Sequence, residues 1–460
     1  MQQKNRTEIF EVLPVPAAVR AMAIPTIIGQ LIVLFYNMAD TFFVGLTNDP
    51  FMIAGTTLIL PVFNLTISLA CLAGVGGSAL VSRLLGQKRE GEASLVFSFC
   101  TYLALGISAA FSLSVLVFRA PLLRLLGANE NIYRYAESYA VCVIVLGGIP
   151  TVLSNVFSNF LRSVGESKKA GFGITMGGII NILLDPLFMF VLLPDGMEII
   201  GAGIATCLSN LISCAYFILV LYRLGSGSVL RLHSPRTLPE KESIRSVFAV
   251  GLPSCISTFL FDADYMVIDR LMSAYGDAAL AAIGIVLKVE RLPLNIGIGI
   301  CQGMVPLVAY NYAAKNRDRL KKIIRYCLLS GIVCALVSLA LYESFTPQIM
   351  RVFVREPQTL AYGTTFLRVR SLATPLMFLC FFHVHLFNGF GEGRRALMLG
   401  VVRWAALNIP MLFLFDHLFG MYGIVCAQAA ADVIMAALSF LAYHRYERAQ
   451  NVRLSGEKEA

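Results

Sequence analysis

The chain has 460 residues, of which 57% are hydrophobic and 14% are charged. Soluble proteins carry roughly 25% charged residues, so this composition excludes an ordinary soluble fold. The formal net charge of +9 is compatible with nucleic-acid binding, but the basic residues gather in alternate short turns between apolar segments. We therefore expect a membrane protein with no nucleic-acid partner.

Apolar segments of about 20 residues, long enough to span a bilayer, recur along the whole chain. The first is full length and follows a polar stretch, which favours a retained helix over a cleaved signal peptide. The sequence predicts an all-α polytopic membrane protein with about twelve transmembrane helices. We expect these helices near residues 17–42, 51–82, 93–118, 132–158, 169–193, 200–222, 245–271, 278–310, 322–344, 360–390, 396–418 and 422–444.

The two halves of the chain repeat one another. Pro25 and Pro253 each open an apolar segment, at an offset of 228 residues (253 − 25). Further matches at offsets of 226 to 228 residues pair the turns 86–90 with 314–318 and 165–170 with 391–396. Each half holds an even number of predicted helices, so the halves are expected to be parallel repeats. Such repeats are typical of secondary transporters, here with two six-helix lobes around a central cavity.

The distribution of charge predicts the orientation of the helices. Turns rich in Lys and Arg alternate with turns that carry none, and the basic turns near Arg119 and Arg351 are the exceptions. By the positive-inside rule, both termini lie in the cytoplasm and the chain crosses the plasma or inner membrane repeatedly. The predicted domains are an N-lobe at 1–222, a cytoplasmic linker at 223–245, a C-lobe at 246–445 and a cytoplasmic tail at 446–460.

A set of polar residues in the first half predicts a cation site. Asp40 lies late in the first predicted helix, while Asn181 and Asp185 lie one turn apart on one face of the fifth. Thr206 in the sixth adds a hydroxyl. Asp40, Asn181 and Asp185 would bind Na⁺ through oxygen ligands, or the two carboxylates would share a proton. The alternative is structural, with Asp185 capping a helix break at Pro186 and Asp40 accepting backbone hydrogen bonds.

The second half lacks this set, because Ile268 stands where Asp40 stands in the first (40 + 228). Its predicted seventh helix carries Asp262, Asp264 and Asp269, and its eighth carries Lys288, Glu290 and Arg291. At least one of these aspartates is expected to pair with the charges of the eighth helix, since buried charges are usually paired. Others are expected to face the cavity, where carboxylates and aromatic rings favour a cationic substrate. The predicted substrate cavity comprises Tyr36, Asn37, Asp262, Asp264 and Glu290.

Other polar residues in the predicted helices favour structural interpretations. His383 and His385 are able to relay protons, but a packing role is the favoured interpretation. Arg403 and Asp432 are expected to be partners of other buried polar groups.

The motifs of enzymes and cofactor sites are missing from the sequence. The segment Gly74–Ser78 lacks the Gly-Lys-Ser/Thr ending of a phosphate loop, so we expect no ATP binding. The 11 Cys residues form no Cys-x-x-Cys pair and predict neither a metal site nor a disulfide framework. An intramembrane enzyme would need a nucleophile and base, and His383 and His385 point in opposite directions on a helix. We expect no enzyme and no cofactor beyond the coupling ion, H⁺ or Na⁺.

At this point the sequence resembles the multidrug and toxic compound extrusion (MATE) family in its bacterial form. The resemblance covers the chain from about Val12 to the end of the last predicted helix. Its motifs are Asn37–Thr41, Leu161–Gly165, Asn181–Pro186 with Gly201–Thr206, and Gln302–Pro306 leading to Tyr310–Tyr312.

The resemblance implies two six-helix lobes and export of organic cations in exchange for inward Na⁺ or H⁺, by a chain that acts as a monomer. It also implies that Asp40, Asn181, Asp185 and Thr206 form the cation site. Some relatives place coupling carboxylates on the seventh and tenth helices, but this chain has no acid between Thr364 and Gly391. A lipid-linked precursor flippase of the same two-lobed plan stays open as the alternative, because Lys288, Arg291 and Arg403 suit an anionic substrate.

Overall fold

The computed structural model describes residues 8–194 and 196–459, which are helical and contain no strand. Ten helices in this part of the chain are long and apolar enough to cross a membrane, and up to twelve spans result if each of two bent helix pairs counts as one. The bent pairs are Glu130–Leu146 with Gly148–Ser163, at 45°, and Pro357–Ser371 with Thr374–Phe390, at 49°. They occupy the spans expected near 132–158 and 360–390, so the predicted all-α fold with about twelve spans is confirmed.

The helices of the first half are α2 (Val15–Leu46), α3 (Pro50–Gly86), α4 (Glu90–Val117), α5 (Arg119–Leu125), α6 (Glu130–Ala140), α7 (Gly148–Ser163), α8 (Ser167–Leu187) and α9 (Glu198–Leu224), with π-helical turns η1 (Val141–Leu146) and η2 (Phe188–Leu192). Those of the second half are α10 (Lys241–Met272), α11 (Asp277–Ala313), α12 (Arg317–Phe353), α13 (Pro357–Ser371), α14 (Thr374–Phe390), α15 (Gly393–Val401), α16 (Ile409–Phe419) and α17 (Met421–Glu459), with the π-helical turn η5 (Val402–Asn408). Two short 3₁₀ turns, η3 (Gly225–Gly227) and η4 (Ser273–Tyr275), complete the list.

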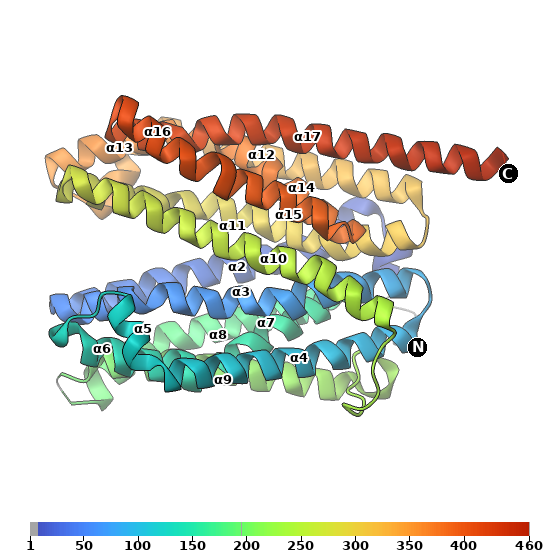
Figure 1. Cartoon of the computed structure of the whole chain (residues 1–460), viewed down its shortest axis with the longest axis horizontal. Helices are drawn as coiled ribbons and strands as arrows, with labels where there is room; N and C mark the ends of the chain where they lie inside the picture. The colour runs from blue at the N-terminus through green and yellow to red at the C-terminus, as the bar shows by residue number, and fades with distance from the viewer. Residues whose placement is uncertain (1–7, 195, 460) are drawn as a thin grey trace.

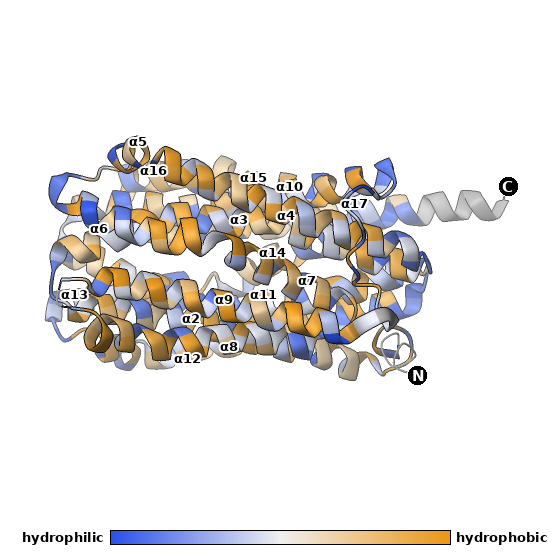
Figure 2. Cartoon of the chain, turned by 90° about the horizontal axis from the view of Figure 1, so that it is seen from below, coloured by the Kyte–Doolittle hydropathy of each residue, from blue (hydrophilic) through white to orange (hydrophobic). Residues whose placement is uncertain are grey.

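The helices form two lobes that lie side by side, α2–α9 in one and α10–α17 in the other (Figure 1). Hydrophobic residues cover the length of the bundle, and hydrophilic residues gather at its two ends (Figure 2). A bilayer requires this distribution, since only the ends reach water. The chain is therefore a multi-pass membrane protein, with the start of α2 and the end of α17 at the same end of the bundle (Figure 1).

The lobes are joined at the end of the bundle where the chain begins. Ala18 and Met22, in the first turns of α2, are buried in a cluster with Met304 and Leu307 of α11. Conversely, Val247 of the C-lobe helix α10 is buried in an N-lobe cluster formed by α3, α4, α7 and α9. Gly251 of α10 lies against the backbone of α3 so closely that a Cβ atom would meet the Leu72 carbonyl. The two lobes thus each receive the first turns of the other lobe's leading helix.

The connection between the lobes is bound to α4. Ser98 donates a hydrogen bond to the Arg231 carbonyl at 2.8 Å, and Tyr102 donates one to the His233 carbonyl at 2.8 Å. At its end Glu240 forms an ion pair with Arg89, with 2.5 Å between the charged atoms. The segment expected to be a linker is therefore held against the N-lobe up to the first turn of α10. The predicted domain boundaries themselves stay predictions, and α17 continues as a helix to Glu459.

Candidate functional site

The four residues predicted to bind a cation come from α2, α8 and α9, which pack closely because their contacts are made by small side chains. Gly178 of α8 faces α2, where a Cβ atom would meet the side chain of Ile32 at 2.5 Å and the ring of Tyr36 at 3.3 Å. A Cβ atom at Gly177, one position earlier, would meet the side chain of Ser213 of α9 at 3.1 Å. Close packing through small residues is the usual means of bringing helices together in a membrane. It places the polar residues of the three helices within reach of one another.

Asn181 is the centre of the site. Its Nδ2 atom donates hydrogen bonds to Oδ1 of Asp185 at 3.2 Å and to Oγ1 of Thr206 at 3.3 Å. Asp185 is fully buried, and Asn181 is 2% exposed. The structure thus brings together three of the four predicted residues by direct contact. The i, i+4 spacing on α8 and the Gly-rich start of α9 were the sequence signals for this part.

Asp40 joins the site through an aromatic neighbour. Tyr139 of α6 donates a long hydrogen bond of 3.5 Å to Oδ2 of Asp40. Tyr139 and Tyr36 both lie within electrostatic range of Asp40 and of Asp185, which places the two carboxylates in one neighbourhood. The sequence did not indicate a role for Tyr139. It lies just before the π-helical turn η1 in a bent span, where regular helical periodicity does not predict which side chains face the site.

Three oxygen atoms of this site have no hydrogen-bond partner although they are buried: Oδ1 of Asp40, Oδ1 of Asn181 and Oδ2 of Asp185. Within the described part of the chain, neither Asp40 nor Asp185 forms an ion pair. Burying a carboxylate without a partner is costly, so such atoms call for a bound proton or cation. Oxygen donors of this kind suit a hard cation such as Na⁺. The residues present therefore fit the predicted coupling ion.

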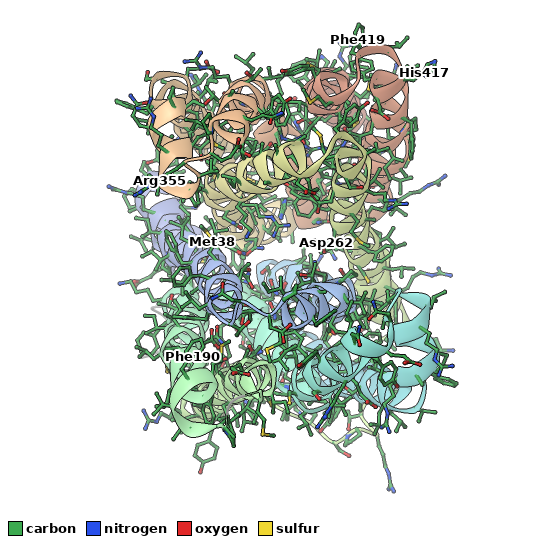
Figure 3. The ribbon with its side chains drawn as sticks, turned by 90° about the vertical axis from the view of Figure 1, so that its left-hand side faces the viewer. Met38, Phe190, Asp262, Arg355, His417 and Phe419 are labelled. Atoms are coloured by element: carbon green, nitrogen blue, oxygen red, sulfur yellow. The ribbon has the colours of Figure 1, made fainter. Side chains whose placement is uncertain are left out.

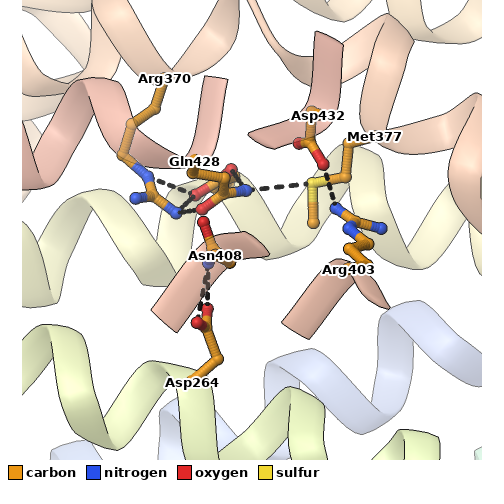
Figure 4. A network of polar contacts seen from close by, with 8 residues as sticks. Asp264, Arg370, Met377, Arg403, Asn408, Gln428 and Asp432 are labelled. Atoms are coloured by element: carbon orange, nitrogen blue, oxygen red, sulfur yellow. Dashed lines mark hydrogen bonds and ion pairs between the residues drawn. The ribbon is translucent and has the colours of Figure 1, made fainter. Parts of the chain in front are cut away.

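The C-lobe holds a second buried polar cluster, which differs in having its own cations (Figure 4). Arg370 of α13 pairs with Glu290 of α11 at 2.8 Å, and the two side chains are 1% and 3% exposed. Gln428 of α17 binds both partners, donating to Oε1 of Glu290 at 3.1 Å and accepting from Arg370. Glu290 is thus neutralised by a residue that the sequence did not single out. Its place in the substrate cavity stays a prediction.

The remainder of the cluster contains two further acids. Arg403 of η5 forms an ion pair of 2.8 Å with Asp432 of α17, both being buried. This confirms the expectation that these two residues are partners of buried polar groups. Asn408 of η5 donates through Nδ2 to both carboxylate oxygens of Asp264, at 2.7 and 2.8 Å. Arg403 also lies over the rings of Trp404 and Phe381, at 4.2 and 4.8 Å from their centroids.

The expected pairing between α10 and α11 is an electrostatic interaction of Arg291 with Asp262 and Asp269 rather than a close ion pair. Among the described residues, no ion pair joins the aspartates of α10 to Lys288 or Arg291. Lys288 is exposed on α11, and Arg291 lies over the ring of Tyr265, 4.9 Å from its centroid. The close partners of Asp264 and Glu290 come instead from η5, α13 and α17, in distant parts of the chain.

The remaining predicted cavity residues lie along the division between the lobes. Met38 of α2 and Asp262 of α10 border it at the end of the bundle opposite to the chain termini (Figure 3). Asp262 is half-buried, and Asn37, which precedes Met38 on α2, is exposed. Midway along the bundle Gln30 of α2 donates a hydrogen bond to Gln302 of α11 at 3.0 Å. Towards the chain termini from this level, Arg83 donates a hydrogen bond to the Phe390 carbonyl and Lys88 donates one to Tyr310, whereas Asp262 lies on the other side of this level.

The histidines of α14 have structural contacts. Nδ1 of His383 lies 2.8 Å from the Leu379 carbonyl, and Nδ1 of His385 lies 2.9 Å from the Phe381 carbonyl. Each ring therefore contacts the backbone one turn earlier on its own helix. This agrees with the favoured interpretation that they are packing residues.

The fold and the site together define a membrane transporter: of two lobes of spanning helices, one holds a pair of carboxylates with no basic partner among the described residues. A model of the MatE family matches residues 25–187 and 253–414, one match in each half and well over half of the chain in total. The chain belongs to this family. Its members are transporters rather than enzymes, so the enzyme alternative is not retained.

Relatives and solved structures agree with this assignment. The chain is 28% identical over 432 residues to the multidrug export protein MepA of Staphylococcus aureus strain NCTC 8325, covering 94% of each protein. Its fold is similar to the crystal structure of MATE in complex with MaL6, with a TM-score of 0.90 at 24% identity over 99% of each chain. It is also similar to an outward-facing multidrug resistance MATE family transporter of the MOP superfamily, with a TM-score of 0.87 at 23% identity over 96% of each chain.

Proposed function

We propose that this transporter exports lipophilic organic cations in exchange for inward-moving H⁺ or Na⁺, without ATP and as a monomer in the plasma or inner membrane. The observation that carries the proposal is the group of three buried oxygens without partners on Asp40, Asn181 and Asp185. The relatives named multidrug export proteins support export as the direction and small molecules as the substrates. They favour an exporter over the lipid-linked precursor flippase.

The coupling ion is proposed to bind between α2 and α8. A cation at Asp40 and Asp185 replaces the missing hydrogen-bond donors and neutralises two acids that repel one another. Asn181 holds Oδ1 of Asp185 in place, and Thr206 contacts the same amide. A proton shared by the two carboxylates would meet the same need, so the site serves either ion.

The substrate is proposed to bind between the lobes, close to α2. Asp262 borders the division between the lobes and forms no ion pair with the described residues. Tyr36 lies on the same helix as Asn37, and its ring faces Gly178 of α8 within electrostatic range of Asp40. A lipophilic cation would contact Asp262, Tyr36 and Asn37, whereas Asp264 and Glu290 are engaged by Asn408 and Arg370.

Exchange follows if the two ligands favour opposite arrangements of α2. This helix carries Asp40 near one end and packs into the C-lobe at the other, with Pro25 between them. Pro25 removes one helical hydrogen bond and provides a site for bending. Cation binding at Asp40 would then alter the contacts that α2 makes with the substrate. By linkage, the substrate must weaken cation binding by the same factor.

The test is efflux of a fluorescent lipophilic cation from proteoliposomes under a Na⁺ gradient alone and a pH gradient alone. We expect one gradient to drive flux, and Asp40→Asn to abolish it. Asp277→Asn, the same chemical change at the exposed first residue of α11, is the matched control and should transport normally. Full coupled transport by Asp40→Asn, or no flux of wild type under either gradient, would contradict the proposal.

A further inference from the structure

Two turns at matching positions of the repeats differ sharply in charge. Residues 87–97 of the N-lobe contain two basic and two acidic side chains, for a net charge of 0 (2 − 2). The matching residues 315–325, at an offset of 228, contain six basic and one acidic, for a net charge of +5 (6 − 1). A general excess of positive charge at one membrane face would affect both turns equally. The difference therefore points to a property of the second turn.

The two basic side chains of the N-lobe turn form ion pairs within the protein, whereas those of the C-lobe turn form no ion pair with the described residues. Lys88 pairs with Glu11 at 2.6 Å, and Arg89 pairs with Glu240 at 2.5 Å. In the C-lobe turn, Arg319 donates three hydrogen bonds to the carbonyls of residues 9, 10 and 13. The other five cations are exposed and form no ion pair with the described residues; they are Lys315, Arg317, Lys321, Lys322 and Arg325.

Three of these cations continue into the apolar outer face of α12. Lys321 and Lys322 lie four and three positions before Arg325, and this side of the helix continues at the side chains of Leu329, four positions after Arg325, and of Val333 and Leu336, four and seven positions after Leu329. Those side chains are large, apolar and exposed: Leu329 at 51%, Val333 at 58% and Leu336 at 49%. Arg325 and Leu329 are one turn apart, about 6 Å along the helix axis. A lipid whose chains cover Leu329 and Val333 would carry its headgroup at the level of Lys321 and Arg325.

We propose that this face of α12 binds the phosphate headgroup of an anionic phospholipid. Exposed lysine and arginine at the edge of an apolar helix face attract anionic lipid through their charges, while their aliphatic stems remain in the interfacial region. An acidic soluble protein would match the charge but not the continuous apolar face that begins one turn away. The N-lobe turn, with no net charge, should show no such preference.

Native mass spectrometry of the full chain in detergent, with added phosphatidylglycerol or phosphatidylcholine, tests the proposal. Wild type should retain phosphatidylglycerol preferentially, and Lys321→Gln with Arg325→Gln should lower its affinity roughly tenfold or more. The matched control is Arg236→Gln with Lys241→Gln, which removes an exposed arginine from the connection between the lobes and an exposed lysine from the first residue of α10. The control should keep the preference. Thermal unfolding would confirm that both variants are folded.

Three results would overturn the proposal. One is an unchanged preference for phosphatidylglycerol in Lys321→Gln with Arg325→Gln. Another is an equal loss in the control, which would mean that net charge alone governs binding. The third is displacement of the lipid by an equal concentration of glycerol phosphate, which would show a site for phosphate rather than for a lipid. Failure of the transport proposal would leave these measurements unaffected, because they require no gradient.

Discussion

The polar sites of the two lobes are built alike but balanced differently. In each, an asparagine amide donates to a buried aspartate, Asn181 to Asp185 in the N-lobe and Asn408 to Asp264 in the C-lobe. The N-lobe site has two acids and no basic partner among the described residues, and three of its oxygens have no hydrogen-bond donor. The C-lobe cluster has three acids and two arginines; they are Asp264, Glu290 and Asp432 with Arg370 and Arg403.

This difference distinguishes acids that are neutralised within the protein from acids that must bind a proton or a cation. A buried carboxylate that already faces an arginine gains little from a further cation, whereas one without a counter-charge must bind a proton or an ion. On this basis we propose that Asp264, Glu290 and Asp432 of the C-lobe stabilise the fold, and that Asp40 and Asp185 of the N-lobe take part in the transport cycle. The presence of Arg370 and Arg403 in the C-lobe cluster, and the absence of a basic partner from the described part of the N-lobe site, is therefore the difference that matters.

The largest expected effect is on transport. Asp185→Asn should reduce gradient-driven efflux to the level of empty proteoliposomes, because the variant offers one carboxylate where the ion needs two. Its unfolding temperature should stay equal or rise, since a buried charge without a basic partner is removed. Efflux and thermal unfolding are measured on the same preparation. Normal transport by Asp185→Asn would contradict the proposed difference between the two lobes.

The second effect is on stability and belongs to the C-lobe. Arg370→Met leaves Glu290 buried without its partner and should lower the free energy of unfolding by about 3–5 kcal/mol. Adding Glu290→Leu should restore much of this loss, because both charges are then absent. Thermal unfolding in detergent measures both. If Arg370→Met is as stable as wild type, the ion pair is not what holds α11 to α13.

A third prediction sharpens the comparison with one substitution in each lobe. Asn408→Leu removes the donor to both oxygens of Asp264 and should cost about 2 kcal/mol in unfolding free energy. Asn181→Leu removes a possible ion ligand as well as a donor. It should weaken the apparent affinity for the coupling ion roughly tenfold, by the loss of one charge-assisted contact. Ion titrations of efflux and unfolding curves separate the two outcomes, and exchanged results would contradict the assignment.

The smallest effect concerns the ion pair of Glu11 and Lys88, two residues of the N-lobe outside the membrane-spanning segments. The hydrogen bond from Lys88 holds the pKa of Glu11 below its ordinary 4.5, and Glu11 holds the pKa of Lys88 above its ordinary 10.5. The contribution of Glu11 is complete above pH 4.5 and is lost as the pH falls through its lowered pKa. That of Lys88 is complete below pH 10.5 and is lost as the pH rises through its raised pKa.

Between these limits the contact is constant, and because both side chains are well exposed it contributes less than about 1 kcal/mol. Glu11→Gln should therefore leave the pH profile of transport between about pH 6 and 8 unchanged. Efflux measured across that range checks this. A shifted profile would mean that the contact, rather than the N-lobe carboxylates, senses pH.

The sequence predicted the parts of the molecule that depend on local patterns. Apolar length gave the spans, the repeat gave the two lobes, and the i, i+4 spacing of Asn181 and Asp185 put them on one face. The ends of α12 were missed because charged residues continue the helix past the apolar segment at both ends, to Arg317 and Phe353.

The hydrogen-bond and ion-pair partners in the C-lobe could not be predicted from the sequence for a different reason. Glu290 meets Arg370 across 80 residues, and Asp264 meets Asn408 across 144. Which helix faces which is set by packing of the whole lobe, and one sequence does not contain that information. The available signal was the presence of Arg370, Asn408 and Gln428 within apolar segments, where buried polar groups require partners.

Displacement of the coupling ion by the substrate tests the central claim most directly. Tetraphenylphosphonium would be added to purified protein, with release of bound ²²Na⁺ and of protons measured in parallel. The account predicts stoichiometric release of one of these ions from wild type and from Asp277→Asn, and none from Asp40→Asn or Asp185→Asn. Binding of tetraphenylphosphonium to wild type without any release, or equal release from Asp185→Asn, would contradict it.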